Sequence, residues 1–291
     1  MMRKMTRTEL LGQVIMNIIF IIVTVVCLYP VLLTLMVSFS SEMSVMRNGM
    51  QFIPEEFSLD AYRMVFADNN IPNAYLVTVT VTAVGTFLSV FICGMAGFAM
   101  SVSTLKYRNA VAFFFYIPMV FSAGLLPWFL VSTQYYQLSD KPWALIVPML
   151  VSPFNVFLAR NYFKTIPASL IESAQIDGCS PMRTLFSIVI PLSVPIIATI
   201  GLFIGLAYWN DFTMALWFIN NPALYPLQYM LFRITSIMDQ IRMHGAMGDM
   251  VMPTQTFRIA TLFVTLGPIV LLYPFVQRYF VKGIMIGAVK G

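Results

Sequence analysis

Charged residues are scarce in this sequence: Asp, Glu, Lys and Arg make up 10% of its 291 residues. A soluble globular protein carries roughly 25% charged residues, so this composition excludes an ordinary soluble enzyme and a disordered tail. Hydrophobic residues make up 59%, including 25 Phe and 22 Met, and the mean hydropathy is +0.82. These values indicate a polytopic membrane protein.

Cysteine and histidine are also scarce, with three Cys and one His. Cys27, Cys93 and Cys179 form no CxxC pair, so they indicate neither a disulfide framework nor a metal site. A single histidine, His244, excludes an HExxH zinc motif, and the sequence lacks a GxxxxGK[ST] phosphate-binding loop. We therefore expect no catalytic residue, metal or cofactor in this chain.

Six stretches lack charged residues over about the 20 positions that a membrane-spanning helix needs. They cover approximately residues 14–37, 74–99, 110–132, 143–159, 186–208 and 259–276. We therefore predict an all-α fold of six transmembrane helices in a single domain, residues 1–291. Nine prolines lie in or beside these stretches and can bend them, although proline is also generally commoner in membrane helices than in soluble ones.

The net charge of +5 is interpreted as membrane topology rather than nucleic-acid binding, because Lys and Arg collect on cytoplasmic loops. With the amino terminus inside, the inner segments hold eleven of the seventeen basic residues and three acidic ones. The outer segments hold six basic and nine acidic residues. This asymmetry predicts that both termini are cytoplasmic.

The spans contain no ionisable Asp, Glu, Lys or Arg with which to bind a coupling ion or sense the membrane potential. Energy for any transport must then enter from outside the membrane region. Because this chain lacks a phosphate-binding loop, an energy-coupled function requires a partner chain.

The loop between the fourth and fifth spans, about residues 164–184, predicts a short helix, a break and a second helix. The first helix covers about Ala168 to Ile176, and Gly178 suits the left-handed position that ends it. Ser180 followed by Pro181 is typical of an N-cap with proline at the next position. The short helix fits either a groove on a partner protein or the lipid interface.

This loop resembles the EAA loop of permease subunits in binding-protein-dependent ABC importers. The family pattern is EAA, three residues, Gly, nine residues, Ile, one residue and LP. Here Glu172-Ser173-Ala174, Gly178, Ile188 and Ile190-Pro191 occur at the same spacings. Ser173 replaces the middle alanine, and Ile190 replaces the leucine.

Two further stretches resemble the sugar-importing branch of this family. YWNDF at residues 208–212 is similar to a WN-containing stretch at the outer end of the fifth span of sugar permeases. The carboxyl end, residues 277–291, resembles the cytoplasmic tail of the maltose-type permease, which reaches the ATPase dimer. The resemblance covers essentially the whole chain and implies the type I ABC importer permease fold.

The resemblance implies a coupling role for residues of the loop and the tail. The helix that carries them would sit in a cleft of an ATPase subunit, which binds the ATP and magnesium. The expected partners are a second permease subunit, two ATPase subunits, an extracytoplasmic solute-binding protein and membrane lipid, in a bacterial cytoplasmic membrane. The coupling residues so implied are Glu172, Ser173, Ala174, Asp177, Gly178, Lys290 and Gly291.

Substrate contacts are expected near the outer end of the fifth span. Tyr208, Trp209, Asn210 and Asp211 supply the aromatic faces and polar groups that bind sugars, although an interfacial aromatic belt has the same composition. By resemblance, the outer loop 211–253 docks the binding protein, or it simply caps the helix bundle. The candidates for this docking are Tyr225, Tyr229, Arg233 and Asp239.

The expected cargo is an oligosaccharide, and no residue identifies which one. The same architecture importing a polyol or glycerol phosphate is the nearest alternative. A stand-alone membrane channel or enzyme is the more distant alternative, because the spans lack carboxylates and the sequence lacks a nucleophile motif.

Overall fold

The chain divides into two compact units. The computed structural model describes residues 7–67, 70–103, 105–243 and 255–270, with side chains from residue 11 onward except at 238, 239 and 241–243. The first unit comprises Met1–Asp68 and Ile234–Leu266, and the second comprises Asn69–Arg233 and Gly267–Gly291. A single domain over residues 1–291 therefore stays a prediction.

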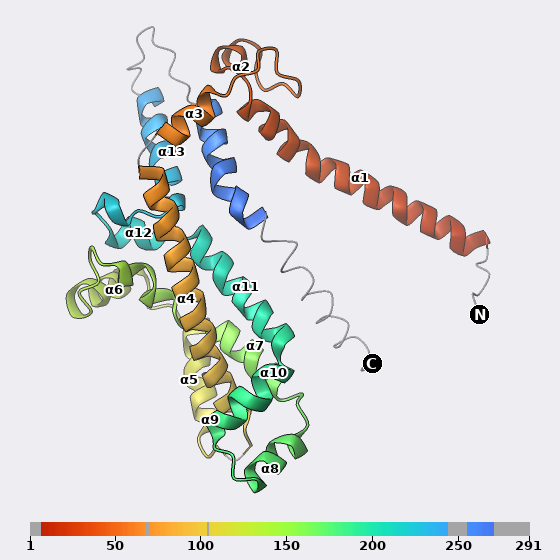
Figure 1. Ribbon diagram of the computed structural model, residues 1–291, viewed down its shortest axis with the longest axis vertical. Helices are drawn as coiled ribbons and strands as arrows, with labels where there is room; N and C mark the ends of the chain where they lie inside the picture. Colours follow the sequence, from red (N-terminus) through yellow and green to blue (C-terminus); the bar gives the residue numbers. More distant parts are fainter. Residues whose placement is uncertain (1–6, 68–69, 104, 244–254, 271–291) are drawn as a thin grey trace. The chain divides into compact units, whose positions relative to one another are not determined.

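The described residues are almost entirely helical, which confirms the all-α class (Figure 1). The first unit holds α1 (Arg7–Ser38), α2 (Glu42–Asn48), α3 (Asp60–Ala67), the end of α13 (Leu227–Met243) and most of an apolar helix, Gln255–Val270. The second unit holds α4 (Asn70–Ser101), α5 (Arg108–Val120), α6 (Leu125–Leu130), η1 (Val131–Tyr135), η2 (Pro142–Leu145), η3 (Val147–Met149), α7 (Pro153–Phe163), α8 (Ala168–Ile176), α9 (Pro181–Thr184), η4 (Leu185–Val189), α10 (Ile190–Leu192), α11 (Val194–Asn210), α12 (Thr213–Phe218), η5 (Pro222–Leu224) and the start of α13.

The second unit is organised around α4, which packs against α7 and α11 (Figure 1). Glycine makes this close approach possible on both sides of α4. A Cβ on Gly97 would lie 2.7 Å from Cβ of Ala159 on α7. A Cβ on Gly85 would lie 2.6 Å from the ring of Tyr208 on α11. Small residues have this role in membrane helices because lipid supplies no hydrophobic force between them.

The predicted spans fall on helices, but several are not straight. Residues 11–38 and 70–101 each form one helix long and apolar enough to cross a membrane. The third, fourth and fifth predicted spans are helix pairs bent by 115°, 49° and 88°. The sixth coincides with the helix Gln255–Val270, and residues 271–276 lie outside the described part of the chain. The number of membrane spans, six, therefore stays a prediction.

Proline accounts for much of this bending. Pro153 begins α7, directly after the 49° bend. Pro191 and Pro195 flank the 88° bend between α10 and α11. A proline removes one intrahelical hydrogen bond and clashes with the preceding turn, so a bend at these positions is expected.

A buried carboxylate joins two distant segments of the first unit. Glu42, the first residue of α2, is 8% exposed. Its Oε1 accepts a hydrogen bond from the backbone N–H of Gln255 at 2.9 Å. Its Oε2 accepts hydrogen bonds from the backbone N–H and the hydroxyl of Thr256, at 2.9 and 2.8 Å. Glu42 therefore caps the positive end of the helix Gln255–Val270.

Replacing this carboxylate by an amide should destabilise the first unit. We expect Glu42→Gln to cost about 1–2 kcal/mol, because hydrogen bonds to a charged acceptor are stronger than neutral ones. The measurement is the midpoint of thermal unfolding of the purified protein in detergent. Glu55→Gln, at an exposed carboxylate of the same loop, is the control, and an equal shift in both variants would contradict the capping role.

Candidate functional site

The loop that carries the EAA-like motif forms the predicted helix and turn. α8 covers Ala168–Ile176, and Gly178 follows it at φ +77°, as predicted. The N–H of Gly178 donates to the carbonyl of Gln175, and the N–H of Cys179 donates to that of Ala174. This pair of bonds is a Schellman motif, which requires a left-handed residue after the helix.

The exposed surface of α8 combines an apolar residue with acidic ones. Ile176 is 86% exposed at the carboxyl end of the helix. Glu172, Ser173 and Asp177 are also exposed, whereas Ala174 is only 4% exposed and is buried against the chain itself. Ala174 therefore supports the turn, and the other members of the motif remain available to a partner.

A turn of four residues, 177–180, joins α8 to α9, the first of the helices that lead into the fifth predicted span. The hydroxyl oxygen of Ser180 accepts a hydrogen bond from the N–H of Arg183, which confirms the predicted N-cap of α9. α9 runs directly into the π-helical segment η4 and then α10. The 88° bend follows, and α11 leads to Tyr208. α8 is thus joined to α11 through one short turn and a series of short helices.

Tyr208, predicted to line a substrate pathway, lies in the core of the second unit. Its side chain is 3% exposed, and its ring occupies the space over Gly85 on α4. The hydroxyl donates to the backbone carbonyl of Ile146 at 2.9 Å and lies 3.2 Å from Oγ of Ser89. These contacts join α11 to α4 and to the end of η2.

The three residues after Tyr208 differ in exposure. Trp209 is 6% exposed, whereas Asn210 lies at the surface. The carboxylate of Asp211 accepts hydrogen bonds from the N–H groups of Thr213 and Met214 and so caps α12. Burial raises the pKa of Asp211 above its ordinary value, and these two hydrogen bonds oppose that effect.

The predicted docking residues of the outer loop are mostly packed together. Tyr225 and Tyr229 meet edge to face with ring centroids 4.8 Å apart, and they are 8% and 9% exposed. Arg233 is exposed, with its guanidinium 5.0 Å from the Tyr225 ring centroid. The side chain of Asp239, like Lys290 and Gly291 of the tail, lies outside the described residues.

Sequence reasoning missed three residues that lie beside Asn210. Nε2 of Gln228 donates to Oδ1 of Asn210 at 3.2 Å. The rings of Phe212 and Phe232 stack with centroids 5.0 Å apart, and each is 36% exposed. We call Asn210, Phe212, Gln228 and Phe232 the aromatic–amide surface. Its sequence signal is the spacing of four between Gln228 and Phe232, which puts both on one face of α13.

Asp140 joins two connections of the second unit, residues 136–141 and 219–221. Its carboxylate accepts hydrogen bonds from the N–H groups of Asn220 and Asn221. Its own N–H donates to the carbonyl of Phe218 at 2.8 Å. These hydrogen bonds stabilise the ionised carboxylate and lower the pKa of Asp140 below its ordinary value. Asp140 has φ +54°, a conformation that Asp tolerates better than most residues.

A cavity of about 410 Å³ opens at the elbow of the third predicted span. Its lining is mainly apolar, with the rings of Trp128 and Tyr136 and the hydroxyl of Ser132. Val147 and Pro148 form another part of its wall, next to the carbonyl that Tyr208 binds. Tyr208 therefore supports this wall and does not line the cavity. The remaining lining residues are Ala123, Pro127, Val131 and Leu138.

Among the described residues, no group of three or more His, Cys, Asp or Glu side chains could hold a metal ion. That the whole chain has no metal of its own stays a prediction.

Comparisons with known proteins agree over nearly the whole chain. Residues 5–286 match the family described as binding-protein-dependent transport system inner membrane component. The polygalacturonan/rhamnogalacturonan transport system permease protein YtcP of Bacillus subtilis is 38% identical over 270 residues, covering 91% of this chain and 93% of that protein. The arabinooligosaccharides transport system permease protein AraQ of Halalkalibacterium halodurans is 29% identical, covering 95% and 96%.

A solved structure also matches. One chain of a bacterial ABC transporter involved in the import of the acidic polysaccharide alginate superposes with a TM-score of 0.84 at 26% identity. The match covers 96% of this chain and 100% of that chain. The sequence-based expectation of the type I importer permease fold is thereby confirmed.

The contact between Gly85 and Tyr208 should tolerate no added methyl group. We expect Gly85→Ala to destabilise the protein by about 1–3 kcal/mol, because overpacking forces the ring or the helices to move. Gly201→Ala is the matched control on α11, since its Cβ would come no closer than 3.8 Å to Val90. The measurement is thermal unfolding in detergent. Equal stability of both variants would contradict this packing.

The Asp140 clamp should make stability depend on pH in the acid range. Because the folded-state pKa of Asp140 is lowered, its contribution is present above the unfolded pKa near 3.8 and is lost as the pH falls through the folded value. We expect Asp140→Asn to lower the unfolding midpoint at pH 7 and at pH 5 equally. Below the ordinary pKa the two proteins should converge, and a constant difference down to pH 3 would contradict the clamp.

Proposed function

The chain belongs to the family of binding-protein-dependent transport system inner membrane components, and from that premise we propose that it forms half of the translocation pathway of an ATP-driven oligosaccharide importer. It is a permease subunit of a sugar ABC importer, a transport component and not an enzyme. The proposal concerns how the subunit couples, which partners it needs and what passes through it.

The exposed surface of α8 is the observation that carries this proposal. A nine-residue helix outside the apolar spans leaves Ile176 86% exposed beside the acidic residues Glu172 and Asp177. An amphipathic helix of this kind is suited to a groove on a partner protein. In the proposed function that groove belongs to the ATPase, and Glu172 contacts its rim.

The proposed coupling step uses the segment of chain that joins α8 to α11. ATP draws the two ATPase subunits together, and each seated α8 moves with its subunit. Because the turn at Gly178 and then α9, η4 and α10 join α8 to α11, this movement is passed along the chain to the contact of Tyr208 with Ile146. The permease pair then turns from inward-facing to outward-facing. Lys290 and Gly291 of the tail add a second ATPase contact.

The proposed topology has six spans with both termini in the cytoplasm of a bacterial cell. The two straight helices α1 and α4, three bent helix pairs and the helix Gln255–Val270 supply the spans. The excess of basic residues on the inner segments supports the orientation. α8 then lies on the cytoplasmic side, and the aromatic–amide surface lies on the outer side.

The proposed assembly contains a sister permease, two ATPase subunits and an extracytoplasmic solute-binding protein. ATP and magnesium bind to the ATPase subunits and not to this chain. The outer loop 211–253 contacts the binding protein through Arg233, beside the packed pair Tyr225 and Tyr229, and through Asp239. Asn210 and its neighbours on the aromatic–amide surface then receive the sugar, while Tyr208, Trp209 and Asp211 position them.

The proposed cargo is an oligosaccharide released from a plant or algal polysaccharide. The relatives are described as permeases for polygalacturonan or rhamnogalacturonan and for arabino-oligosaccharides, and the solved transporter imports alginate. Stacked aromatic rings next to paired amides suit the apolar ring faces and hydroxyls of such sugars. Polyols and glycerol phosphate lack the extended ring faces that this surface would bind.

The first experiment is purification of the complex through an amino-terminal tag, which leaves the tail unmodified. We expect a second permease and an ATPase at two copies per complex, and vesicles that take up oligogalacturonides or arabino-oligosaccharides when ATP and the binding protein are supplied. A chain that purifies alone and moves a solute without ATP would overturn the proposal.

Gly178 provides a direct test of coupling. We expect Gly178→Pro to reduce uptake by roughly tenfold or more, because proline fixes φ near −65° and removes an N–H, whereas Gly178 has φ +77° and donates to Gln175. Gly178→Asn is the matched control, because asparagine tolerates the left-handed conformation and keeps its N–H. Uptake, ATP hydrolysis and membrane insertion are measured together.

The result distinguishes coupling from folding. The expected result is normal insertion of both variants, with near-normal uptake for asparagine and hydrolysis without uptake for proline. Normal uptake by Gly178→Pro would mean that the turn after α8 does not transmit the movement.

A further inference from the structure

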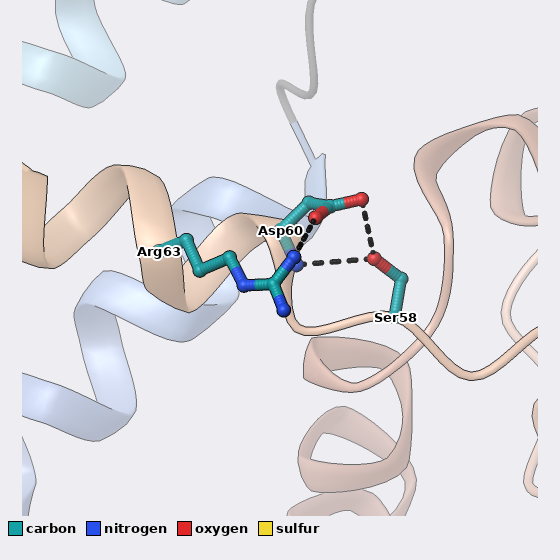
Figure 2. Close-up of polar contacts among 3 residues, drawn as sticks. All are labelled: Ser58, Asp60 and Arg63. Atoms are coloured by element: carbon teal, nitrogen blue, oxygen red, sulfur yellow. Dashed lines mark hydrogen bonds and ion pairs between the residues drawn. The ribbon is translucent and has the colours of Figure 1, made fainter.

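The loop that follows α1 is closed at its base by backbone hydrogen bonds. The N–H of Ser41 donates to the carbonyl of Glu56 at 3.0 Å, and the N–H of Ser58 donates to that of Phe39 at 2.8 Å. Figure 2 shows the start of α3 directly after this base, where Ser58 and Arg63 both bind Asp60. Residues 42–57 therefore form a loop with fixed ends, which we call the outer loop flap.

The polar side chains of the flap are paired near its base. Nδ2 of Asn48 donates to Oε2 of Glu55, and Oγ of Ser41 donates to Oε2 of Glu56. The buried carboxylate of Glu42 fixes the start of α2 to the helix Gln255–Val270. The remaining polar side chains of the flap are Ser44 and Arg47 on α2 and Gln51, of which only Arg47 is exposed.

The tip of the flap is apolar and uncovered. Met50, Phe52 and Ile53 are 51%, 44% and 78% exposed. Gly49, with φ +76°, turns the chain from α2 into this tip. Burying apolar side chains is favourable by about 25 cal/mol per Å² of surface removed from water. The exposed apolar tip therefore indicates contact with lipid or with another protein.

The position of the tip along α1 indicates that lipid covers it. The ring of Phe52 stacks on that of Tyr29, with centroids 6.3 Å apart and an interplanar angle of 7°. Tyr29 precedes the end of α1 at Ser38 by nine residues, so the tip folds back about 14 Å beside the helix at 1.5 Å per residue. Counted from residue 14, where the predicted span begins, about 20 residues cross the hydrocarbon core and reach Leu33, one turn beyond Tyr29.

We infer that the tip of the outer loop flap inserts into the outer leaflet of the membrane, with lipid as its occupant. Tyr29 and Phe52 then lie at the outer boundary of the hydrocarbon core, where aromatic rings are favoured. Met50 and Ile53 enter the acyl chains beside α1, whose residues 11–32 are all exposed and are themselves covered by lipid or protein. The inference rests on the orientation of α1 in the proposed function.

The test measures the depth of spin labels in the complete transporter reconstituted into phospholipid nanodiscs. Three single-cysteine forms are made on a background in which the other native cysteines are alanine. One keeps the exposed Cys27 on α1, one carries Ile53→Cys at the tip, and one carries Arg47→Cys on α2. Collisions with oxygen, which concentrates in lipid, are compared with collisions with a water-soluble nickel chelate.

Lipid insertion predicts that the label at position 53 resembles the label at Cys27. Both should have an oxygen-to-nickel collision ratio several times that of the label at position 47. A label at position 53 as accessible to nickel as the one at position 47 would overturn the inference, because the tip would lie in water. A label at position 53 shielded from both reagents would also overturn it, in favour of a protein partner.

Failure of the proposed function would give a different result. If α1 did not span the membrane as proposed, the label at Cys27 itself would lack the lipid signature. If the assembly were wrong, the purified complex would lack the ATPase. Uptake by each single-cysteine form shows that the labelled transporter remains intact.

Discussion

The close approach of α4 to its two neighbours is the constraint on which the second unit depends. Lipid supplies no hydrophobic force between helices, so association relies on packing and on hydrogen bonds. Gly97 lets α4 approach the backbone of α7, and Gly85 makes room for the ring of Tyr208. With the ring in place, its hydroxyl reaches the carbonyl of Ile146 and fixes the η2 end of the fourth predicted span. One pair of small residues thus positions helices from three predicted spans.

The same packing connects α11 to the wall of the cavity. Tyr208 near the end of α11 holds the residue that precedes Val147 and Pro148, part of the wall of the 410 Å³ cavity. A turn of four residues and then α9, η4 and α10 join α8 to α11. In the proposed function, a movement of α8 would reach the cavity wall along this path.

Local signals predicted the loop 164–184 closely. Gly178 and the pair Ser180-Pro181 each act on their own backbone, and α8 has the predicted bounds. Long-range packing was beyond sequence reasoning. The burial of Tyr208 depends on Gly85, more than 120 residues earlier, and nothing within YWNDF distinguishes a buried tyrosine from an exposed one. Proline indicated bends, but the 115° angle between α5 and the segment Leu125–Tyr135 occurs at residues 121–124, where Gly124 has φ +82°.

The exposure of α1 has a consequence for biogenesis. Residues 11–32 are all exposed, so this helix gains little stability from the other described helices of the first unit. In the proposed topology, its own apolar side chains are sufficient to drive its insertion by the translocon. The nascent chain would then be anchored before α4 emerges, and the glycine-mediated packing of α4, α7 and α11 would form afterwards within the bilayer.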